Sequence, residues 1–356
     1  MAKIADTLQV DYDEFCGALA AKDLQPLWKI NKQIMPQQPH PKTLPWLWNW
    51  STLLPLAQRA GELITIDRGG DRRVLALCNP GLNGMPYTST TLWGAVQYLA
   101  PGESAPAHRH TPGAIRFVME GEGVWTTVNG DACDMTPGDL VLTPNWHWHD
   151  HTNAGDQPMV WFDGLDLPLV GWMESVFFEL YPDNLQPIDA RNGSERLYGR
   201  GTVPTDREEQ SLHSPLLRYP YSEVSLQLDA MLEETGLEVT TLNYVNPING
   251  HSALPTLGLE MTRIREGAST RPYRKAGSSI VVVFRGAGHS VIDGQRFDWS
   301  EHDIFVIPSW ATVEHVASES SDLFVTTDRP VLQVLGLFRE EYLEHPQKVT
   351  GTFEPR

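Results

Sequence analysis

Cysteine is scarce in this sequence. The three cysteines, Cys16, Cys78 and Cys133, lie far apart, and no two of them form a C-x-x-C pair. A disulfide framework needs an even set of cysteines, and a thiolate metal site needs closely paired ones. The sequence therefore argues against both and favours a reduced, cytoplasmic setting.

Long apolar runs and positive charge are also lacking. No stretch reaches the roughly eighteen uninterrupted apolar residues of a membrane-spanning helix, and the first residues, MAKIADTLQVDYDE, lack the apolar core of a signal peptide. The sequence has 27 Lys and Arg but 45 Asp and Glu, which gives a net charge of -18. Nucleic acid and anionic lipid repel such a surface, so we expect neither a nucleic-acid partner nor a membrane. A small anionic substrate needs only a few local cations and stays compatible with this charge.

Glycine and proline, by contrast, are plentiful, with 29 and 27 residues spread along the 356-residue chain. This distribution indicates many turns between short strands. The length exceeds one typical domain and favours two similar units with additional segments. We expect five regions: a helical, Trp-rich N-terminal arm (1–90), a first β-domain (91–168), a mixed connecting segment (169–255), a second, degenerate β-domain (256–340) and a C-terminal tail (341–356).

Two stretches outside the β-domains have a helical pattern, residues 10–35 and 222–235. Between the first of these and the β-rich region, Trp46, Trp48 and Trp50 alternate beside prolines. Aromatic residues of this kind usually anchor a segment on a core or on a subunit interface. We interpret the tryptophans in this way.

The two β-rich regions are copies of one another. Matching residues recur at an offset of 165 or 164: Gly121 and Gly123 with Gly286 and Gly288, and Asp139, Pro144 and Trp146 with Asp303, Pro308 and Trp310. A shared pattern with a single slip is what a duplicated domain leaves. Two small antiparallel barrels or jelly rolls are the simplest interpretation.

Histidines cluster at two places in the first copy. His108 and His110 flank one arginine, and the sequence His-Trp-His-Asp-His fills 147–151. Residues i and i+2 of a strand project from one face, so two imidazoles of one strand and one from a later strand can converge on a metal such as iron, copper, nickel or zinc. A lone His-x-His pair is more often a surface or core feature. The metal-site interpretation gains weight because the second copy has lost all these histidines.

Both clusters lie in segments that resemble the motifs of the cupin family. Residues 102–121 resemble the first motif, G-x5-H-x-H-x3,4-E-x6-G, and residues 138–153 resemble the second, G-x5-P-x-G-x2-H-x3-N. The resemblance assigns three metal ligands, His108 and His110 from the first motif and His149 from the second.

Two residues depart from these motifs. Trp146 replaces the motif glycine, and Ala114 stands where the usual glutamate ligand falls. Germin-like cupins and many sugar isomerases keep that glutamate, whereas the gentisate and salicylate ring-cleaving dioxygenases resemble this chain in lacking it. The phrases HRHTPGAIRFVMEGEGVWTTVNGD and VWFDGLD are similar to that subgroup in particular.

In the second copy, the ligand positions carry Tyr273, Lys275 and Val313. His315 stands two residues beyond the expected ligand position, and we interpret it as incidental. We therefore expect one metal per chain, in the first barrel.

The resemblance implies a mainly β bicupin fold, with two jelly-roll β-barrels and an N-terminal helical arm. It also implies an Fe(II)-dependent, extradiol-type dioxygenase of aromatic catabolism that cleaves gentisate (2,5-dihydroxybenzoate) with O2 to maleylpyruvate. Three neutral histidines leave the metal its full positive charge, which favours a chelating dianion, and zinc lacks the redox chemistry required. The resemblance further implies a cytoplasmic homotetramer.

The same resemblance gives roles to residues near the triad. Arg116 is expected to meet the substrate carboxylate, His151 to bind substrate and act as acid or base, and Asp163 to orient a histidine. The alternatives are a surface arginine, a solvent-facing loop histidine and a turn-capping aspartate.

Further residues are expected to bind the substrate. Trp93, Ala95 and Gln97 alternate along one strand and are placed in the aromatic pocket, although core packing explains Trp93 equally well. Arg72 is a further candidate, with a solvated basic loop as its alternative.

Other functions stay open at this point. Salicylate and 1-hydroxy-2-naphthoate dioxygenases share the ligand pattern, and the size of residue 95 is one position that would separate their substrates. A zinc isomerase would need the carboxylate that Ala114 lacks. A non-catalytic bicupin ligand-binding protein is the alternative from a different class, and it would be favoured if both copies had lost the ligands.

Overall fold

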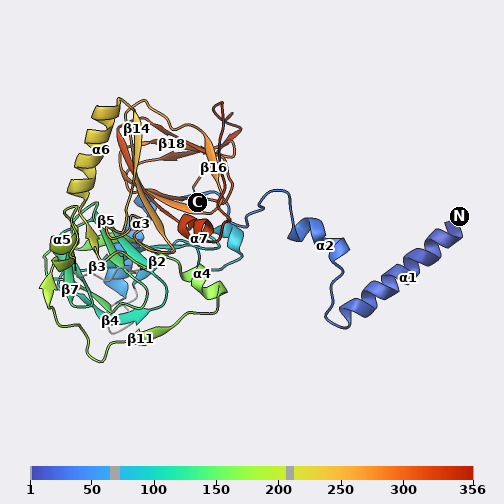
Figure 1. The fold of residues 1–356 in the computed structure, drawn as a ribbon, viewed down its shortest axis with the longest axis horizontal. Coiled ribbons are helices and arrows are strands. Elements are labelled where there is room, and N and C mark those ends of the chain that lie inside the picture. Colours follow the sequence, from blue (N-terminus) through green and yellow to red (C-terminus); the bar gives the residue numbers. More distant parts are fainter. Residues whose placement is uncertain (1, 65–72, 206–211, 356) are drawn as a thin grey trace. The chain divides into compact units, whose positions relative to one another are not determined.

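A computed structural model describes residues 2–64, 73–205 and 212–355 (Figure 1). The chain divides into two units, Met1–His40 and Pro41–Arg356. The first unit holds α1 (Ala2–Ala20) and α2 (Leu27–Ile34). The ring of Phe15 stacks on that of Trp28, and Trp28 Nε1 donates a hydrogen bond of 2.9 Å to the Tyr12 hydroxyl. The segment 10–35, predicted as helical, thus spans parts of two helices, and Pro26 stands immediately before the second.

The second unit contains two β-barrels, each made of two six-stranded sheets. One sheet of the first barrel has the order β13 (Arg218–Tyr219), β8 (Leu140–Thr143), β5 (Ala114–Glu120), β10 (Met159–Leu165), β3 (Trp93–Leu99) and β2 (Val74–Ala76). The other has the order β11 (Phe178–Leu180), β4 (Ser104–His110), β9 (His149–Asn153), β6 (Val124–Val128), β7 (Asp131–Met135) and β12 (Ala190–Arg191).

The second barrel repeats this arrangement. Its first sheet has the order β1 (Trp46–Trp48), β20 (Ile304–Ile307), β17 (Ser279–Arg285), β22 (Ser321–Thr327), β15 (Gly258–Ile264) and β14 (Val239–Asn243). Its second has the order β23 (Glu340–Tyr342), β16 (Tyr273–Lys275), β21 (Val313–Ala317), β18 (Gly288–Ile292), β19 (Gln295–Trp299) and β24 (Gly351–Thr352). The predicted mainly β, duplicated fold is confirmed.

Short helical elements connect the strands. They are α3 (Trp50–Leu63), the 3-10 turn η3 (Pro80–Leu82), α4 (Leu167–Trp172), α5 (Gly193–Tyr198), α6 (Tyr221–Thr235) and α7 (Arg329–Val334). The helix predicted at 222–235 is confirmed by α6, which packs beside β14 in Figure 1. No helix in the described parts of the chain is long and apolar enough to cross a membrane.

The two repeats exchange their first strands. β1 precedes the first barrel along the chain but pairs with β20 of the second, and β13 precedes the second barrel but pairs with β8 of the first. A buried carboxylate lies at each crossing. Asp303 accepts a 2.7 Å hydrogen bond from the backbone N–H of Trp50, at the start of α3, and Asp139 accepts one of 2.9 Å from Tyr221, at the start of α6. Each of the two repeated aspartates thus accepts a hydrogen bond from a backbone N–H at the start of a helix, where the N–H groups have no partner within the helix.

We expect Asp303→Ala to destabilise the whole second unit. Asp303 is 2% exposed, and its loss leaves the buried N–H of Trp50 and that of Ser300 without an acceptor. The expected cost is on the order of 2 kcal/mol or more, measured as a lower denaturant midpoint. Asp298→Ala is the matched control, because its carboxylate pairs with Arg296 at the surface, where an ion pair contributes little. Equal midpoints for the two variants would contradict this prediction.

The strands β5 and β17 are buried along most of their length. On β5, Ile115 and Phe117 belong to the core between the barrels, where the ring of Phe117 stacks on that of Phe324 at 4.1 Å. The intervening Arg116 and Val118 point into the first barrel. Both faces of these strands are therefore buried, and the inward face of β5 is available for a polar site.

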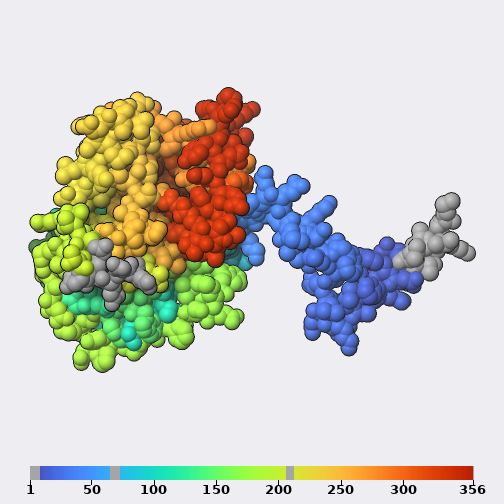
Figure 2. All heavy atoms as spheres, viewed as in Figure 1, coloured from blue at the N-terminus to red at the C-terminus, as the bar shows by residue number. Residues whose placement is uncertain are grey.

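The region boundaries of the structure differ from those expected. The first unit ends at His40 rather than at residue 90, because residues 46–48 and 74–76 are strands of the barrel sheets. Trp50 is buried in the core between the barrels. The expected tail, 341–356, supplies strands to the second barrel, and Figure 2 shows the red C-terminal residues lying against its orange elements.

Candidate metal centre

Two of the predicted ligands lie on β4. His108 and His110 project into the first barrel, and their ring centroids are 5.7 Å apart. Arg109, between them, points the other way and forms an ion pair with Glu179. This alternation is what a strand imposes on an i, i+2 pair.

The third histidine comes from β9, which pairs with β4. His149 lies directly opposite His108 in the strand register, and its ring centroid is 4.3 Å from that of His108 and 4.8 Å from that of His110. One ring nitrogen of each histidine lies within 4.8 Å of the others. Within the described residues, this is the one group of three His, Cys, Asp or Glu side chains with such a geometry.

Backbone carbonyls orient all three rings. His108 Nδ1 lies 2.9 Å from the Pro106 carbonyl oxygen, His110 Nδ1 lies 2.7 Å from that of Pro112, and His149 Nδ1 lies 2.9 Å from that of His147. A carbonyl only accepts, so each Nδ1 carries the proton and each Nε2 keeps a lone pair.

The state of His149 suits metal coordination. Its side chain is almost fully buried, and its Nε2 has no hydrogen-bond partner among the residues that the structure describes. Burial, together with the neighbouring histidines, holds the pKa of His149 well below its usual range, so the ring is neutral. A buried, neutral, unpartnered nitrogen is costly unless it binds something. The three residues therefore fit a divalent metal.

Trp146, in the place of the motif glycine, has a backbone φ of 62°. This left-handed conformation is strained for a bulky residue, and glycine favours it. The Arg109 guanidinium lies over the rings of Trp146 and Trp148, 4.4 Å and 4.3 Å from their centroids. Trp310 in the second repeat has a φ of 66° and carries Arg274 over its ring at 4.9 Å. Both repeats thus keep the glycine conformation and use a tryptophan for a cation–π contact.

A buried polar group lies beside the triad. Arg116 on β5 is 4% exposed, and its Nε donates to His151 Nε2 at 3.2 Å and lies 3.7 Å from Asp163 Oδ1. Its Nη1 donates to the Thr143 hydroxyl at 2.6 Å. The three residues named from the resemblance are therefore in one cluster. Arg116 is not at the surface, and His151 is on strand β9 rather than on a solvent-facing loop.

The hydrogen bonds also set the form of His151. Its Nε2 accepts from Arg116, so the proton is on Nδ1, which lies 2.8 Å from the Thr126 hydroxyl oxygen. In this arrangement His151 positions the guanidinium of Arg116.

Two of the metal ligands, His108 and His110, line one cavity of about 130 Å³ together with Arg116. Trp93 and Gln97 of β3 line it too, as does His151. Ala95 lies between Trp93 and Gln97 but is fully buried opposite Asp163 and does not reach the cavity. Arg72 lies outside the described residues. Val74 and Leu165 also line the cavity, and sequence reasoning missed both because a lone apolar residue carries no signal of a site.

The second barrel places Tyr273, Lys275 and Val313 at the ligand positions, in agreement with the sequence alignment of the repeats. His315 is not incidental in position. It is the counterpart of His151, since its Nδ1 lies 2.7 Å from the Ser290 hydroxyl just as His151 meets Thr126.

We expect the ionisation of Asp163 to determine how kcat/KM falls at acidic pH. Burial, opposed by Arg116 and Trp161, raises the pKa of Asp163 to about 6. Because the carboxyl pKa is raised in the folded protein, its contribution to folding stability is fully present below pH 3.8, the ordinary pKa of the group. That contribution is lost as pH rises through about 6. Asp163 is therefore charged at neutral pH despite a cost to stability, and it loses the charge that faces Arg116 as pH falls below 6.

The wild-type pH profile of kcat/KM should therefore fall below about pH 6. Asp163→Asn should have lower activity at neutral pH and lack this limb. Trp161→Phe removes a hydrogen bond that lowers the pKa of Asp163, so it should shift the limb to higher pH. The prediction is wrong if the asparagine variant keeps the wild-type limb.

Comparisons with known proteins agree with this geometry. A cupin domain model matches residues 95–165. The chain is 44% identical over 354 residues to a gentisate 1,2-dioxygenase of Streptomyces, covering 96% of this chain and 97% of that protein. It is 39% identical to gentisate 1,2 dioxygenase 1 of Aquipseudomonas alcaligenes, covering 92% and 95%. The solved structure of salicylate 1,2-dioxygenase from Pseudoaminobacter salicylatoxidans with gentisate adducts matches with a TM-score of 0.89 and 39% identity, covering 94% of each chain.

Proposed function

Because this chain belongs to the family of bicupin dioxygenases that includes gentisate 1,2-dioxygenase, we propose that it cleaves the ring of gentisate with O2 to give maleylpyruvate, using one Fe(II) per chain. One observation carries the proposal. One ring nitrogen of each of three histidines, His108, His110 and His149, lies within 4.8 Å of the others, beside a cavity that the buried cation Arg116 also lines.

We assign the three histidines as the holders of iron. His108, His110 and His149 would hold the metal through their Nε2 atoms. None of the three ligands is anionic, so a divalent metal and Arg116 both favour a dianionic chelate such as the carboxylate and adjacent oxygen of gentisate. When bound, iron supplies the electron exchange between the aromatic ring and dioxygen, which zinc cannot.

The surrounding residues bind and orient the substrate. Arg116 donates from its guanidinium to an anionic oxygen of the substrate, while His151 and Asp163 hold that guanidinium in place and Asp163 balances its charge. Trp93 offers an aromatic wall to the ring, and Gln97 offers a polar group. For His151 to act as a general acid or base, its Nε2 must give up the hydrogen bond from Arg116 and form one with a substrate hydroxyl.

Anaerobic reconstitution with Fe(II), followed by gentisate and air, tests the proposal. We expect stoichiometric oxygen uptake and the absorbance of a ring-opened product, with metal-free protein as the control. Turnover of salicylate or 1-hydroxy-2-naphthoate in place of gentisate would keep the iron chemistry and change the substrate. Stoichiometric iron without oxygen uptake on any of these acids would overturn the proposal and favour a non-catalytic binding protein.

We further propose a cytoplasmic homotetramer. The three cysteines are free thiols, as a reducing compartment requires. The first unit exposes large apolar side chains, Phe15, Leu27 and Trp28 among them, as an assembly surface does. Light scattering on the purified protein tests the tetramer, and a monomer at micromolar concentration would contradict it.

A further inference from the structure

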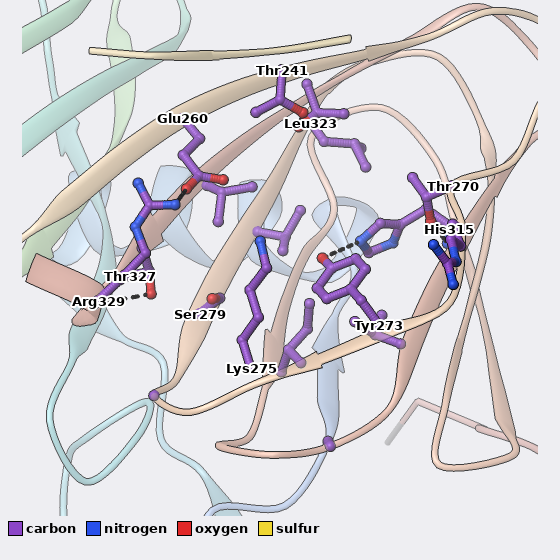
Figure 3. A pocket seen from close by; sticks show the side chains of 18 of the residues that line it. Thr241, Glu260, Thr270, Tyr273, Lys275, Ser279, His315, Leu323, Thr327 and Arg329 are labelled. Atoms are coloured by element: carbon purple, nitrogen blue, oxygen red, sulfur yellow. Dashed lines mark hydrogen bonds and ion pairs between the residues drawn. The ribbon is translucent and has the colours of Figure 1, made fainter. Parts of the chain in front are cut away.

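The second barrel holds a cavity that is larger than the one beside the histidine triad. Its volume is about 340 Å³, compared with about 130 Å³ beside the histidine triad. It occupies the place in its barrel that the metal cavity occupies in the first, since Tyr273, Lys275 and His315 line it (Figure 3). The proposed dioxygenase chemistry does not use this cavity.

A lysine takes the place of a metal ligand there. Lys275 is the counterpart of His110, and Figure 3 shows its side chain rising from β16 into the middle of the cavity. Its ammonium lies 4.8 Å from the centre of the Tyr273 ring. No carboxylate lies within ion-pair distance of Lys275 in the parts of the chain that the structure describes. The second barrel thus has a cation at the position equivalent to a metal ligand of the first, without a protein anion to balance it.

The other charges of the cavity do not balance Lys275. Glu260 is the one acidic residue of the lining, and Arg329 forms an ion pair with it, as the dashed line in Figure 3 shows. Arg271, which is exposed, adds a second cation to the lining and lies over the Tyr342 ring. The lining therefore carries a net positive charge in a protein of net charge -18. This local reversal of charge favours an anion.

Neutral donors stand around the lysine. The Tyr273 hydroxyl lies 3.4 Å from His315 Nε2, and His315 Nδ1 lies 2.7 Å from the Ser290 hydroxyl. Burial and the charge of Lys275 lower the pKa of His315 to about 4, so this ring is neutral at pH 7. Such groups give hydrogen bonds to a ligand without adding charge.

The walls of the cavity are apolar where those of the first barrel are charged. Val281 is the counterpart of Arg116, and Val325 is the counterpart of Asp163, as the strand registers of the two repeats show. Leu323 and Val313 add further apolar surface. A flat apolar ligand that carries one anionic group matches walls of this kind around one cation.

We propose that the second barrel is a metal-free binding site for a small aromatic carboxylate, which Lys275 holds by its carboxylate group and the valine-lined walls hold by its ring. The site is separate from the metal cavity, and its existence does not depend on the proposed ring cleavage.

Anaerobic equilibrium dialysis of salicylate against the iron-loaded full chain tests the proposal. We expect Lys275→Met to bind one salicylate per chain fewer than the wild type, because the affinity of the lost site falls by about tenfold or more without the charge-assisted contact. Lys348→Met removes the same charge at an exposed position of the same barrel and should keep the wild-type stoichiometry.

Val325→Phe is a second variant, which narrows the cavity without a change of charge and should lose the same site. Iron content and circular dichroism show that each variant folds. If the iron site does not bind salicylate, the wild type binds one and Lys275→Met none, which still supports the second site. Equal stoichiometry in the wild type and both variants would overturn it.

Discussion

Replacing His149 with alanine should abolish both iron binding and oxygen uptake. His149 is the ligand whose Nε2 is buried with no partner among the described residues, and the ring faces both other ligands. Its loss leaves two imidazoles, which cannot hold three positions of one metal face. We expect the affinity for Fe(II) to fall by more than the roughly 10- to 100-fold that outer-sphere partners are worth, with turnover lost in proportion. Iron content by plasma emission and oxygen uptake are the two measurements.

His147→Ala is the matched control, two residues away in the same histidine cluster. The His147 ring packs against His213, with centroids 4.6 Å apart, and it does not line the cavity. We expect wild-type iron content and turnover. Stoichiometric iron in His149→Ala, or equal losses in both variants, would show that the assigned triad is wrong.

The triad could be predicted from the sequence by two arguments. Strand alternation places His108 and His110 on one face, and the resemblance to the second cupin motif assigns His149. The fold followed from the duplication of the β-rich regions. The contacts that the sequence could not predict are those that depend on sheet register.

Arg116 and Asp163 illustrate this dependence. They stand opposite one another on β5 and β10, 47 positions apart in the chain, and no local pattern predicts that pairing. The exchange of β1 and β13 between the barrels could not be predicted from the sequence either. The position of each strand in the chain is compatible with pairing in either barrel. The resemblance and the alternation along β3 both predict Ala95 in the pocket, but only Trp93 and Gln97 of these three residues line it, and Ala95 is fully buried.

The second barrel shows how a duplicated fold can lose a metal and keep a cavity. Tyr273, Lys275 and Val313 remove every ligand, yet the His315–Ser290 contact persists in the geometry of His151 and Thr126. Val281 and Val325 stand where the first barrel has the buried pair Arg116 and Asp163, so neither charge is present without the other. Such joint replacement is consistent with a barrel that remains well packed and widens its interior.

Replacing Arg116 with methionine should lower kcat/KM for gentisate by about a hundred- to a thousandfold, the usual effect of removing one preorganised donor from an active site. Iron content should stay at the wild-type level. Arg116 makes no hydrogen bond to the backbone carbonyls that orient the three ligand rings through their Nδ1 atoms. The guanidinium makes three contacts, with His151, Thr143 and Asp163. A lysine cannot reproduce all of them, so Arg116→Lys should be intermediate.

Stability must be separated from activity in this test. Without Arg116, the pKa of Asp163 should rise further above about 6, because the positive charge that lowers it is gone, and less of the carboxyl should be ionised at pH 7. The double variant Arg116→Met/Asp163→Asn should therefore be as stable as Arg116→Met alone while remaining inactive. Arg109→Met is the matched control, since Arg109 lies on the opposite face of β4, between Trp146 and Trp148, and should leave kcat/KM within about threefold. Wild-type kcat/KM in Arg116→Met with full iron would remove Arg116 from substrate binding, whereas a loss shared equally by Arg109→Met would point to the barrel as a whole rather than to the cation in its cavity.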